Sequence, residues 1–173
     1  MRASVVAAIV LLSAVARADD PSLLSSVTLT GTDARPAQLR RYAGKPAVVF
    51  YEDRGSIATN QALKDALVEQ GRQHGLLNAV SVIAIANISA YNFPPAREIA
   101  TAFIRRAERQ AGIPILLDLS GALQAPPWTL PDDASTVLLL DADGRVVWRH
   151  SGKVPAAESA RMLDQLRQLV ATG

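Results

Sequence analysis

The sequence predicts a three-layer α/β fold, in which a mixed central sheet has helices on both faces and the chain closes with a β-hairpin and a helix. Two continuous apolar runs, residues 47–52 and 80–86, have the length of strands buried on both faces of a sheet. An amphipathic helical pattern follows each run. Nearer the C-terminus, strand-like runs at 136–140 and 145–149 flank Asp141-Ala142-Asp143-Gly144, and an Asp-Gly turn between two strands predicts a hairpin.

The remaining elements follow from turn residues and periodicity. In chain order we expect a strand at 27–30, a helical turn at 38–42, the strand at 47–52, a turn at 53–56, a helix to about Gln73, the strand at 80–86, a helix from Pro95 to about 111, a strand at 115–119, an irregular segment at 120–133, the hairpin, and a helix at 155–170. Both strand–helix–strand connections predict parallel pairing at the centre of the sheet. The inner stripe expected for the second helix consists of Ile99, Ala102, Phe103 and Ala107.

The N-terminal residues have the pattern of a secretory signal peptide. A positive start at Met1-Arg2 precedes an apolar run at 5–12, which is too short to span a bilayer, and Ala16-Arg17-Ala18 has the small residues of a cleavage site. We therefore expect a signal peptide at 1–18 and one domain at 19–173. The protein is expected to be periplasmic or secreted, with no stable membrane insertion after cleavage.

Charge and cysteine usage exclude two large classes of function. Of the 18 Lys and Arg residues, Arg2 and Arg17 belong to the expected leader, so 16 remain against 16 Asp and Glu. A chain of nearly zero net charge gives no electrostatic reason to expect nucleic acid as a partner. The sequence contains no cysteine, so disulfide exchange, peroxide reduction and thiolate metal sites are all ruled out.

These elements, in this order, resemble the thioredoxin-like superfamily, in particular its redoxins and the YtfJ-type periplasmic proteins, which also lack the paired cysteines. The likeness lies in Leu29-Thr30, in the segment 44–51 that leads into the first central strand, and in the terminal hairpin at 137–148 with Gly152. It covers nearly all of the expected domain. The fold it implies agrees with the one predicted from the residue patterns.

The resemblance also indicates what this chain lacks. Redox-active relatives carry Cys-x-x-Cys at the start of the helix after the first central strand, and those positions fall on Gly55 and Ala58 here. They also carry a cis-proline just before the hairpin, where this chain has Ser135 and its nearest proline is Pro131. A cis bond before a residue other than proline costs about 2.5–4 kcal/mol, so we expect a trans bond at Ser135.

The candidate binding site is a corner in the segment 53–60, where Asp53, Arg54, Gly55 and Ser56 are singled out together with Ser135. An exposed helix N-terminus offers unpaired N–H groups to an anion or a peptide carboxylate, and Arg54 would add a positive charge. In the superfamily this corner is where partner polypeptides dock. The alternative is that Asp53 or Ser56 only caps the helix while Arg54 is solvated.

No catalytic residue, metal site or cofactor is expected. Asp141-x-Asp143-Gly144 resembles the start of a calcium loop but lacks the later Glu, which favours a hairpin turn. His74 and His150 are too far apart in sequence to suggest a metal site, and no Gly-x-Ser-x-Gly turn supports hydrolysis. The arginines of the second helix, Arg105, Arg106 and Arg109, are interpreted as a solvated face.

The function predicted from the sequence is therefore binding. We expect a non-redox partner-binding or scaffold module of the cell envelope, a monomer or weak oligomer, whose partner is an unknown envelope protein or peptide. Two alternatives remain at this stage. One is an oxidoreductase by ancestry only, and the other is a carrier of small anions or peptides.

Overall fold

The computed structural model describes residues 22–172, and the predicted signal peptide lies outside them. Its elements, in chain order, are α1 (Leu23–Ser26), β1 (Thr28–Gly31), β2 (Pro36–Gln38), η1 (Leu39–Tyr42), β3 (Ala47–Glu52), α2 (Gln61–His74), α3 (Leu76–Ala79), β4 (Ser81–Asn87), η2 (Ser89–Tyr91), α4 (Ala96–Ala111), β5 (Ile115–Asp118), β6 (Thr136–Leu140), β7 (Val146–Ser151) and α5 (Ala156–Thr172). No helix among these residues is long and apolar enough to cross a bilayer.

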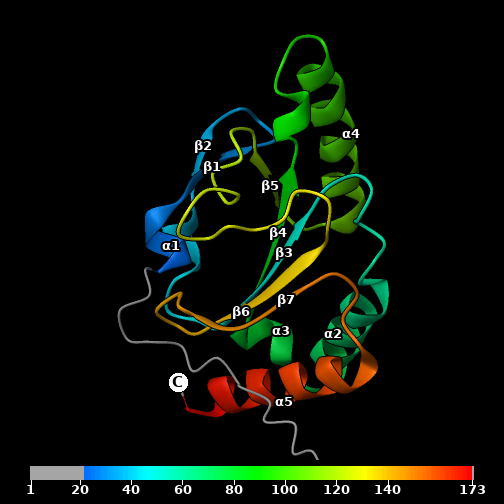
Figure 1. Cartoon of the computed structure of the whole chain (residues 1–173). Helices are drawn as coiled ribbons and strands as arrows, with labels where there is room; N and C mark the ends of the chain where they lie inside the picture. The colour runs from blue at the N-terminus through cyan, green and yellow to red at the C-terminus, as the bar shows by residue number, and fades with distance from the viewer. Residues whose placement is uncertain (1–21, 173) are drawn as a thin grey trace, which may run out of the picture.

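A single mixed sheet of seven strands runs through the molecule, in the order β2-β1-β5-β4-β3-β6-β7 (Figure 1). β3, β4 and β5 are parallel, as the two crossover connections predict, and all the other pairs are antiparallel. The terminal hairpin is confirmed, because β6 and β7 pair on either side of Asp141–Gly144. The three-layer α/β prediction is therefore confirmed.

The core is divided between the two faces of the sheet. Alternate side chains of β3 point to opposite faces, so Val48 and Phe50 belong to one apolar cluster while Val49 and Tyr51 belong to the other. The first cluster is closed by α2, α3 and α5, which lie together below the sheet in Figure 1. The second is closed by α1, β1 and η1 and by Leu123, Trp128 and Leu130 from the segment between β5 and β6.

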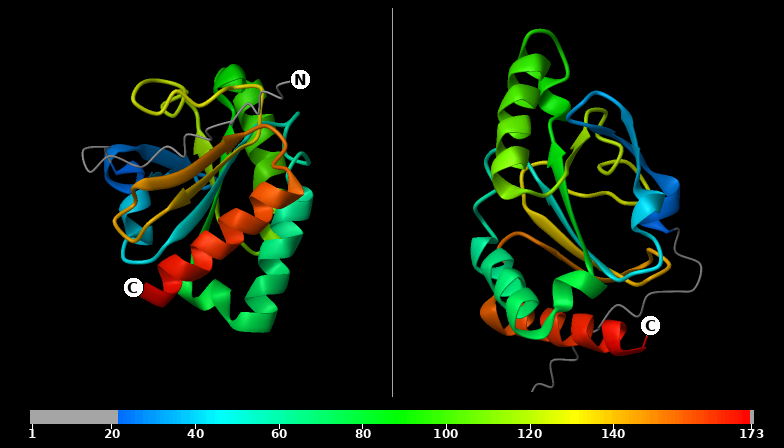
Figure 2. Two further views of the ribbon diagram at one scale, coloured as in Figure 1. Left: turned by 60° about the horizontal axis from the view of Figure 1, so that its bottom comes forward. Right: turned by 180° about the vertical axis from the view of Figure 1, so that it is seen from behind.

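The expected inner stripe of α4 is wrong. Ile99 and Phe103 are 55% and 70% exposed, Ala102 is exposed as well, Ala107 is only half-buried, and α4 contains no buried residue. No residue of α4 belongs to either core cluster. Consequently α4 stands at one side of the molecule, as Figure 2 shows from two directions.

Four short elements were not expected from the sequence. α1 and α3 have four residues each, and β2 and η2 have three each, so they are too short to show a periodic pattern. β2 begins at Pro36 and forms an outer edge of the sheet, the position in which a strand tolerates proline.

The start of α2 is also corrected. The helix begins at Gln61, several residues beyond the predicted turn at 53–56, and the residues between them form further turns. Gly55 and Ala58 therefore lie in a loop ahead of the helix.

Candidate functional site: the corner after β3

Three loops meet at one end of the central strands. β3 and β4 are parallel, with Glu52 paired with Ala86, so the chain leaves both strands at the same end. β6 runs antiparallel to β3 and begins where Tyr51 pairs with Thr136, which brings Ser135 to that end as well. The topology thus joins the predicted segment 53–56 to Ser135, as the sequence analysis proposed.

The segment after β3 is a closed turn. The backbone N–H of Ser56 donates to Oδ1 of Asp53 at 2.8 Å, and the backbone N–H of Asp53 donates to Oγ of Ser56 at 3.0 Å. Ser56 is buried and Asp53 is half-buried, while Arg54 and Gly55 are exposed at the tip. This reciprocal pair satisfies backbone donors that the turn would otherwise leave open, so it stabilises one loop conformation.

Asn60 ties the far end of this loop to the hairpin. Its amide nitrogen donates to Oγ of Ser135 at 2.9 Å and to the carbonyl of Gly152 at 3.0 Å, and its amide oxygen accepts from the backbone N–H of Val154 at 2.8 Å. Asn60 directly precedes α2 but makes no side-chain capping bond to it. The same side chain cannot serve both purposes, and the bonds to the hairpin hold the loop.

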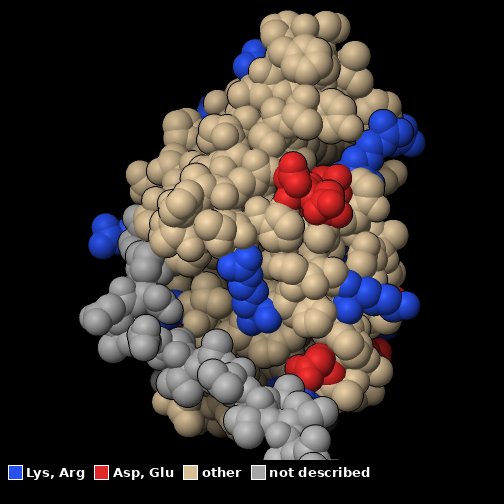
Figure 3. Space-filling model, in the orientation of Figure 1, with Lys and Arg blue, Asp and Glu red and all other residues tan. Residues whose placement is uncertain are grey.

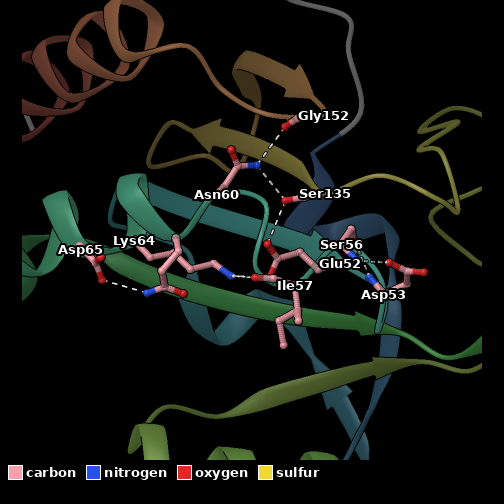
Figure 4. Close-up of polar contacts among 10 residues, drawn as sticks. Glu52, Asp53, Ser56, Ile57, Asn60, Lys64, Asp65, Ser135 and Gly152 are labelled. Carbon is pink, nitrogen blue, oxygen red and sulfur yellow. Dashed lines mark hydrogen bonds and ion pairs between the residues drawn. The ribbon is translucent and has the colours of Figure 1, made fainter.

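Glu52 continues this network into the protein (Figure 4). Its carboxylate accepts a hydrogen bond from Oγ of Ser135 at 2.8 Å and pairs with Nζ of Lys64 at 2.7 Å. Lys64 donates in addition to the carbonyl of Ile57 at 2.8 Å, and its Nζ lies 5.3 Å from the centre of the Phe50 ring. Glu52 is 8% exposed and Ser135 is fully buried, so the network compensates a buried carboxylate on both of its oxygens.

Ser135 takes the position where redox-active relatives are expected to carry a cis-proline. Its preceding peptide bond is trans, as predicted, since the cis bonds among residues 22–172 are Pro94–Pro95 and Pro126–Pro127. Its carbonyl accepts from the backbone N–H of Gly152 at 2.8 Å, and its hydroxyl is bonded to Glu52 and Asn60. All these contacts are with other residues of the protein, so Ser135 stabilises the corner from the interior and does not form its surface.

The structure does not support an anion site made by residues 54–56 at a helix N-terminus. These residues were expected beside the first turn of the helix, whereas α2 starts at Gln61. Arg54 remains exposed, and no ion pair to it is found among residues 22–172. The corner therefore exposes side chains, and not the free N–H groups of a helix N-terminus.

Ile57 belongs to this surface but was not singled out as a candidate residue from the sequence. Its side chain is 53% exposed in the loop between the Asp53–Ser56 turn and Asn60, and its carbonyl is held by Lys64. Figure 4 shows it pointing away from the Glu52 network. A single apolar residue in a turn carries no periodic signal, and only its position beside Gly55-Ser56 hinted at a role.

The serine hydroxyls of the corner are not paired with a histidine base. The chain has no cysteine, and the buried hydroxyls of Ser56 and Ser135 have carboxylate, amide or backbone partners and no histidine. His150 lies elsewhere, with its ring stacked on Trp148 at 6.0 Å between centroids and its Nε2 beside the carbonyl of Lys153. Within residues 22–172 no cluster of three potential metal ligands occurs.

A second buried polar pair lies on the opposite face of β3. The hydroxyl of Tyr51 donates to Oδ2 of Asp118 at 3.3 Å, and that carboxylate also accepts from the backbone N–H groups of Ala122 and Leu123. Burial, together with the nearby Asp118 carboxylate, raises the pKa of Tyr51 above its usual range. This pair anchors the segment that closes the second core cluster and does not reach the corner.

The overall charge pattern agrees with the sequence analysis. Figure 3 shows, on the face it presents, a few acidic and basic groups scattered over a mostly uncharged surface.

The Asp141–Gly144 turn is closed by its own residues, because Asp141 accepts from the backbone N–H of Arg145 and Asp143 pairs with the Arg145 guanidinium. The hairpin interpretation is thus preferred to a calcium loop.

Comparison with solved structures identifies the fold. A putative thiol:disulfide interchange protein DsbE from Chlorobium tepidum is similar with a TM-score of 0.60 and 17% identity, over 87% of this chain and 97% of that one. The exposed lipoprotein thioredoxin Etrx1 of Streptococcus pneumoniae has a TM-score of 0.59 and 18% identity, over 82% of this chain and 98% of that one. An uncharacterized thioredoxin-like protein from Porphyromonas gingivalis has a TM-score of 0.57 and 19% identity, over 88% and 94%.

Comparison of the sequence with family models and curated proteins adds no match. At identities of this size, similarity of structure establishes the fold and nothing finer. The chain has the thioredoxin-like fold, without a cysteine to serve as its redox centre.

Proposed function

We propose that this protein is an exported, non-redox module that binds a partner polypeptide at the corner formed by Arg54, Gly55 and Ile57. The observation that carries the proposal is Ile57, an apolar side chain 53% exposed on a loop fixed at both ends. The partner class is an envelope protein or a peptide segment from one.

The absence of thiols supports binding over redox chemistry. Exchange of a disulfide needs an attacking thiolate, and the chain supplies none. The fold is shared with a protein described as a thiol:disulfide interchange protein, and the usual cysteine positions correspond to Gly55 and Ala58. Ancestry thus accounts for the likeness, while the residues now present at the corner are suited to contact.

A fixed loop lowers the cost of binding. Immobilising a flexible side chain or loop on association costs roughly 0.5–1.5 kcal/mol for each rotamer-rich group. Here the Asp53–Ser56 turn and the bonds of Asn60 hold the backbone on both sides of Ile57 before any partner arrives. Ile57 can therefore act as a pre-positioned anchor.

The charge of the corner indicates the partner's chemistry. Arg54 is exposed and next to the exposed Gly55, which leaves the backbone accessible. An extended segment with an apolar side chain for Ile57 and a carboxylate for Arg54 would match this surface. Export is supported by the signal-like residues 1–18 and by the description of one similar structure as an exposed lipoprotein.

In-cell photo-crosslinking tests the proposal. A photoreactive amino acid is placed at position 57 of the full chain, and the same residue at position 68 serves as the control, since Val68 is 45% exposed on α2. We expect a discrete crosslinked partner, identified by mass spectrometry, from position 57 and not from position 68. Identical adducts from both positions would refute a special role for the corner.

A further inference from the structure

The exposed apolar side chains of α4 form a second surface, separate from the corner. Ile99 and Phe103 lie one helical turn apart and so share a face, and they are 55% and 70% exposed. Phe93, in the loop just before the helix, is 57% exposed, and Tyr91 in η2 is 39% exposed. None of the four belongs to either core cluster.

Arginines continue this face toward the C-terminal end of the helix. Arg106 follows Phe103 by three residues and so adjoins it, and Arg109 follows Arg106 by three and adjoins that arginine. Neither guanidinium has an ion-pair partner among residues 22–172. The unneutralised charge beside the apolar surface is therefore positive.

The acidic groups of α4 are already engaged. Glu98 pairs with Arg97 on the same helix, and Glu108 accepts from the Thr32 hydroxyl and from the backbone N–H of Ile115. A second copy of the chain, docked helix to helix, would thus bring no free acid of α4 to Arg106 and Arg109. The charge pattern favours an anionic partner over self-association.

The surface also projects from the molecule. The loop between η2 and α4 forms its upper extremity in Figure 1, and the view from behind in Figure 2 shows the same projection. In Figure 3 this end is largely uncharged. A projecting apolar end suits contact with a flat surface, whereas a groove would suit a peptide.

We propose that α4 docks on an anionic lipid surface. Phe93, Ile99 and Phe103 enter the boundary between headgroups and acyl chains, and Arg106 and Arg109 contact lipid phosphates. Interfacial helices bury their apolar face roughly 5–10 Å into this boundary while their Lys and Arg side chains stay at the level of the headgroups.

Flotation with vesicles tests the proposal. Vesicles contain phosphatidylethanolamine and phosphatidylglycerol in a three-to-one ratio, and phosphatidylcholine vesicles provide the neutral comparison. The protein is purified as cells process it, and all variants are checked by mass spectrometry for the same N-terminus, so any apolar leader contributes equally. We expect the wild type to bind the anionic vesicles, and Arg106→Gln/Arg109→Gln to weaken that binding roughly tenfold or more.

The apolar contribution is tested by Ile99→Gln/Phe103→Gln, with Val68→Gln as the matched control. Glutamine is a good helix former and both positions are exposed, so circular dichroism should show an unchanged fold. We expect at least a tenfold loss of vesicle binding in the double variant, no loss in the control, and none in Ile57→Gln, which separates this proposal from the corner.

Three results would overturn the proposal. The first is equal binding of wild type and Ile99→Gln/Phe103→Gln, and the second is no preference of the wild type for anionic vesicles. The third is a dimer in lipid-free solution, seen by sedimentation velocity, that the double variant converts to a monomer, because the apolar face would then belong to a second copy.

Discussion

Asn60, Glu52 and Ser135 are separated by up to 83 residues in sequence, yet their polar atoms form one buried network. Ser135 could be identified through the family resemblance, whereas Asn60 and Glu52 were not singled out from the sequence. No local pattern distinguishes a buried Asn before a helix from a capping one, because the distinction depends on which strand lies opposite. The location of the corner could be predicted, but its internal bonding could not.

Asn60→Ala should destabilise the fold. It removes three hydrogen bonds and leaves the N–H of Val154 and the carbonyl of Gly152 without this partner. A buried polar group without a partner costs about 1–3 kcal/mol, so we expect a loss of about 2–4 kcal/mol in the free energy of unfolding by urea titration. Gln61→Ala, at an exposed position next to it, should change that free energy by less than about 0.5 kcal/mol. Equal effects of the two variants would contradict the assignment.

Tyr51 should make the protein sensitive to alkali. Because its pKa is raised in the folded state, both states hold the proton below pH ~10, and the unfolded state releases it first as the pH rises. Stability is therefore retained below pH ~10 and lost above it, by up to about 1.4 kcal/mol per pH unit.

Tyr51→Phe provides the comparison for that prediction. The variant loses the hydrogen bond to Asp118 but should show a shallower loss of stability above pH ~10 in urea titrations from pH 8 to 11. Tyr91→Phe, at an exposed tyrosine, should keep the slope of the wild type. Identical slopes for Tyr51→Phe and wild type would exclude Tyr51 as the source.

At the scale of whole elements, continuous apolar runs were the most informative signal. β3, β4 and β6 are flanked by turn residues and lie at the centre of the sheet, where apolar side chains are buried on both faces. Periodicity was less informative for α4. It correctly indicated an amphipathic helix but could not reveal that no residue of this helix joins either core cluster.

α4 is attached chiefly through polar contacts, which makes a prediction about its local stability. Glu108 bonds to Thr32 and to the N–H of Ile115, and Arg105 bonds to the Thr32 carbonyl. In Glu108→Ala we expect faster amide hydrogen exchange across residues 96–111, with exchange in β3 and β6 unchanged. Glu98→Ala is the control, since Glu98 pairs only within the helix. A uniform acceleration in all elements would contradict a local role.

At the scale of the molecule, the fold is shared with disulfide-interchange proteins while the chemistry is absent. The architecture is maintained by two apolar clusters on either side of one sheet, and neither cluster depends on the redox position. At the corner, which has no cysteine, a buried Glu52–Lys64 pair and Ser135 hold the loops in place. We propose two surfaces for contact on this molecule, the corner at Ile57 and the face of α4.

The role of Ile57 as the anchor for a partner is tested by calorimetry. The partner identified by crosslinking is titrated against wild type, Ile57→Asp and Val68→Asp. Ile57→Asp should weaken binding at least tenfold, because a charge replaces the apolar anchor, while Val68→Asp should stay within about twofold of wild type. Equal affinities for wild type and Ile57→Asp would show that the corner is not the binding site.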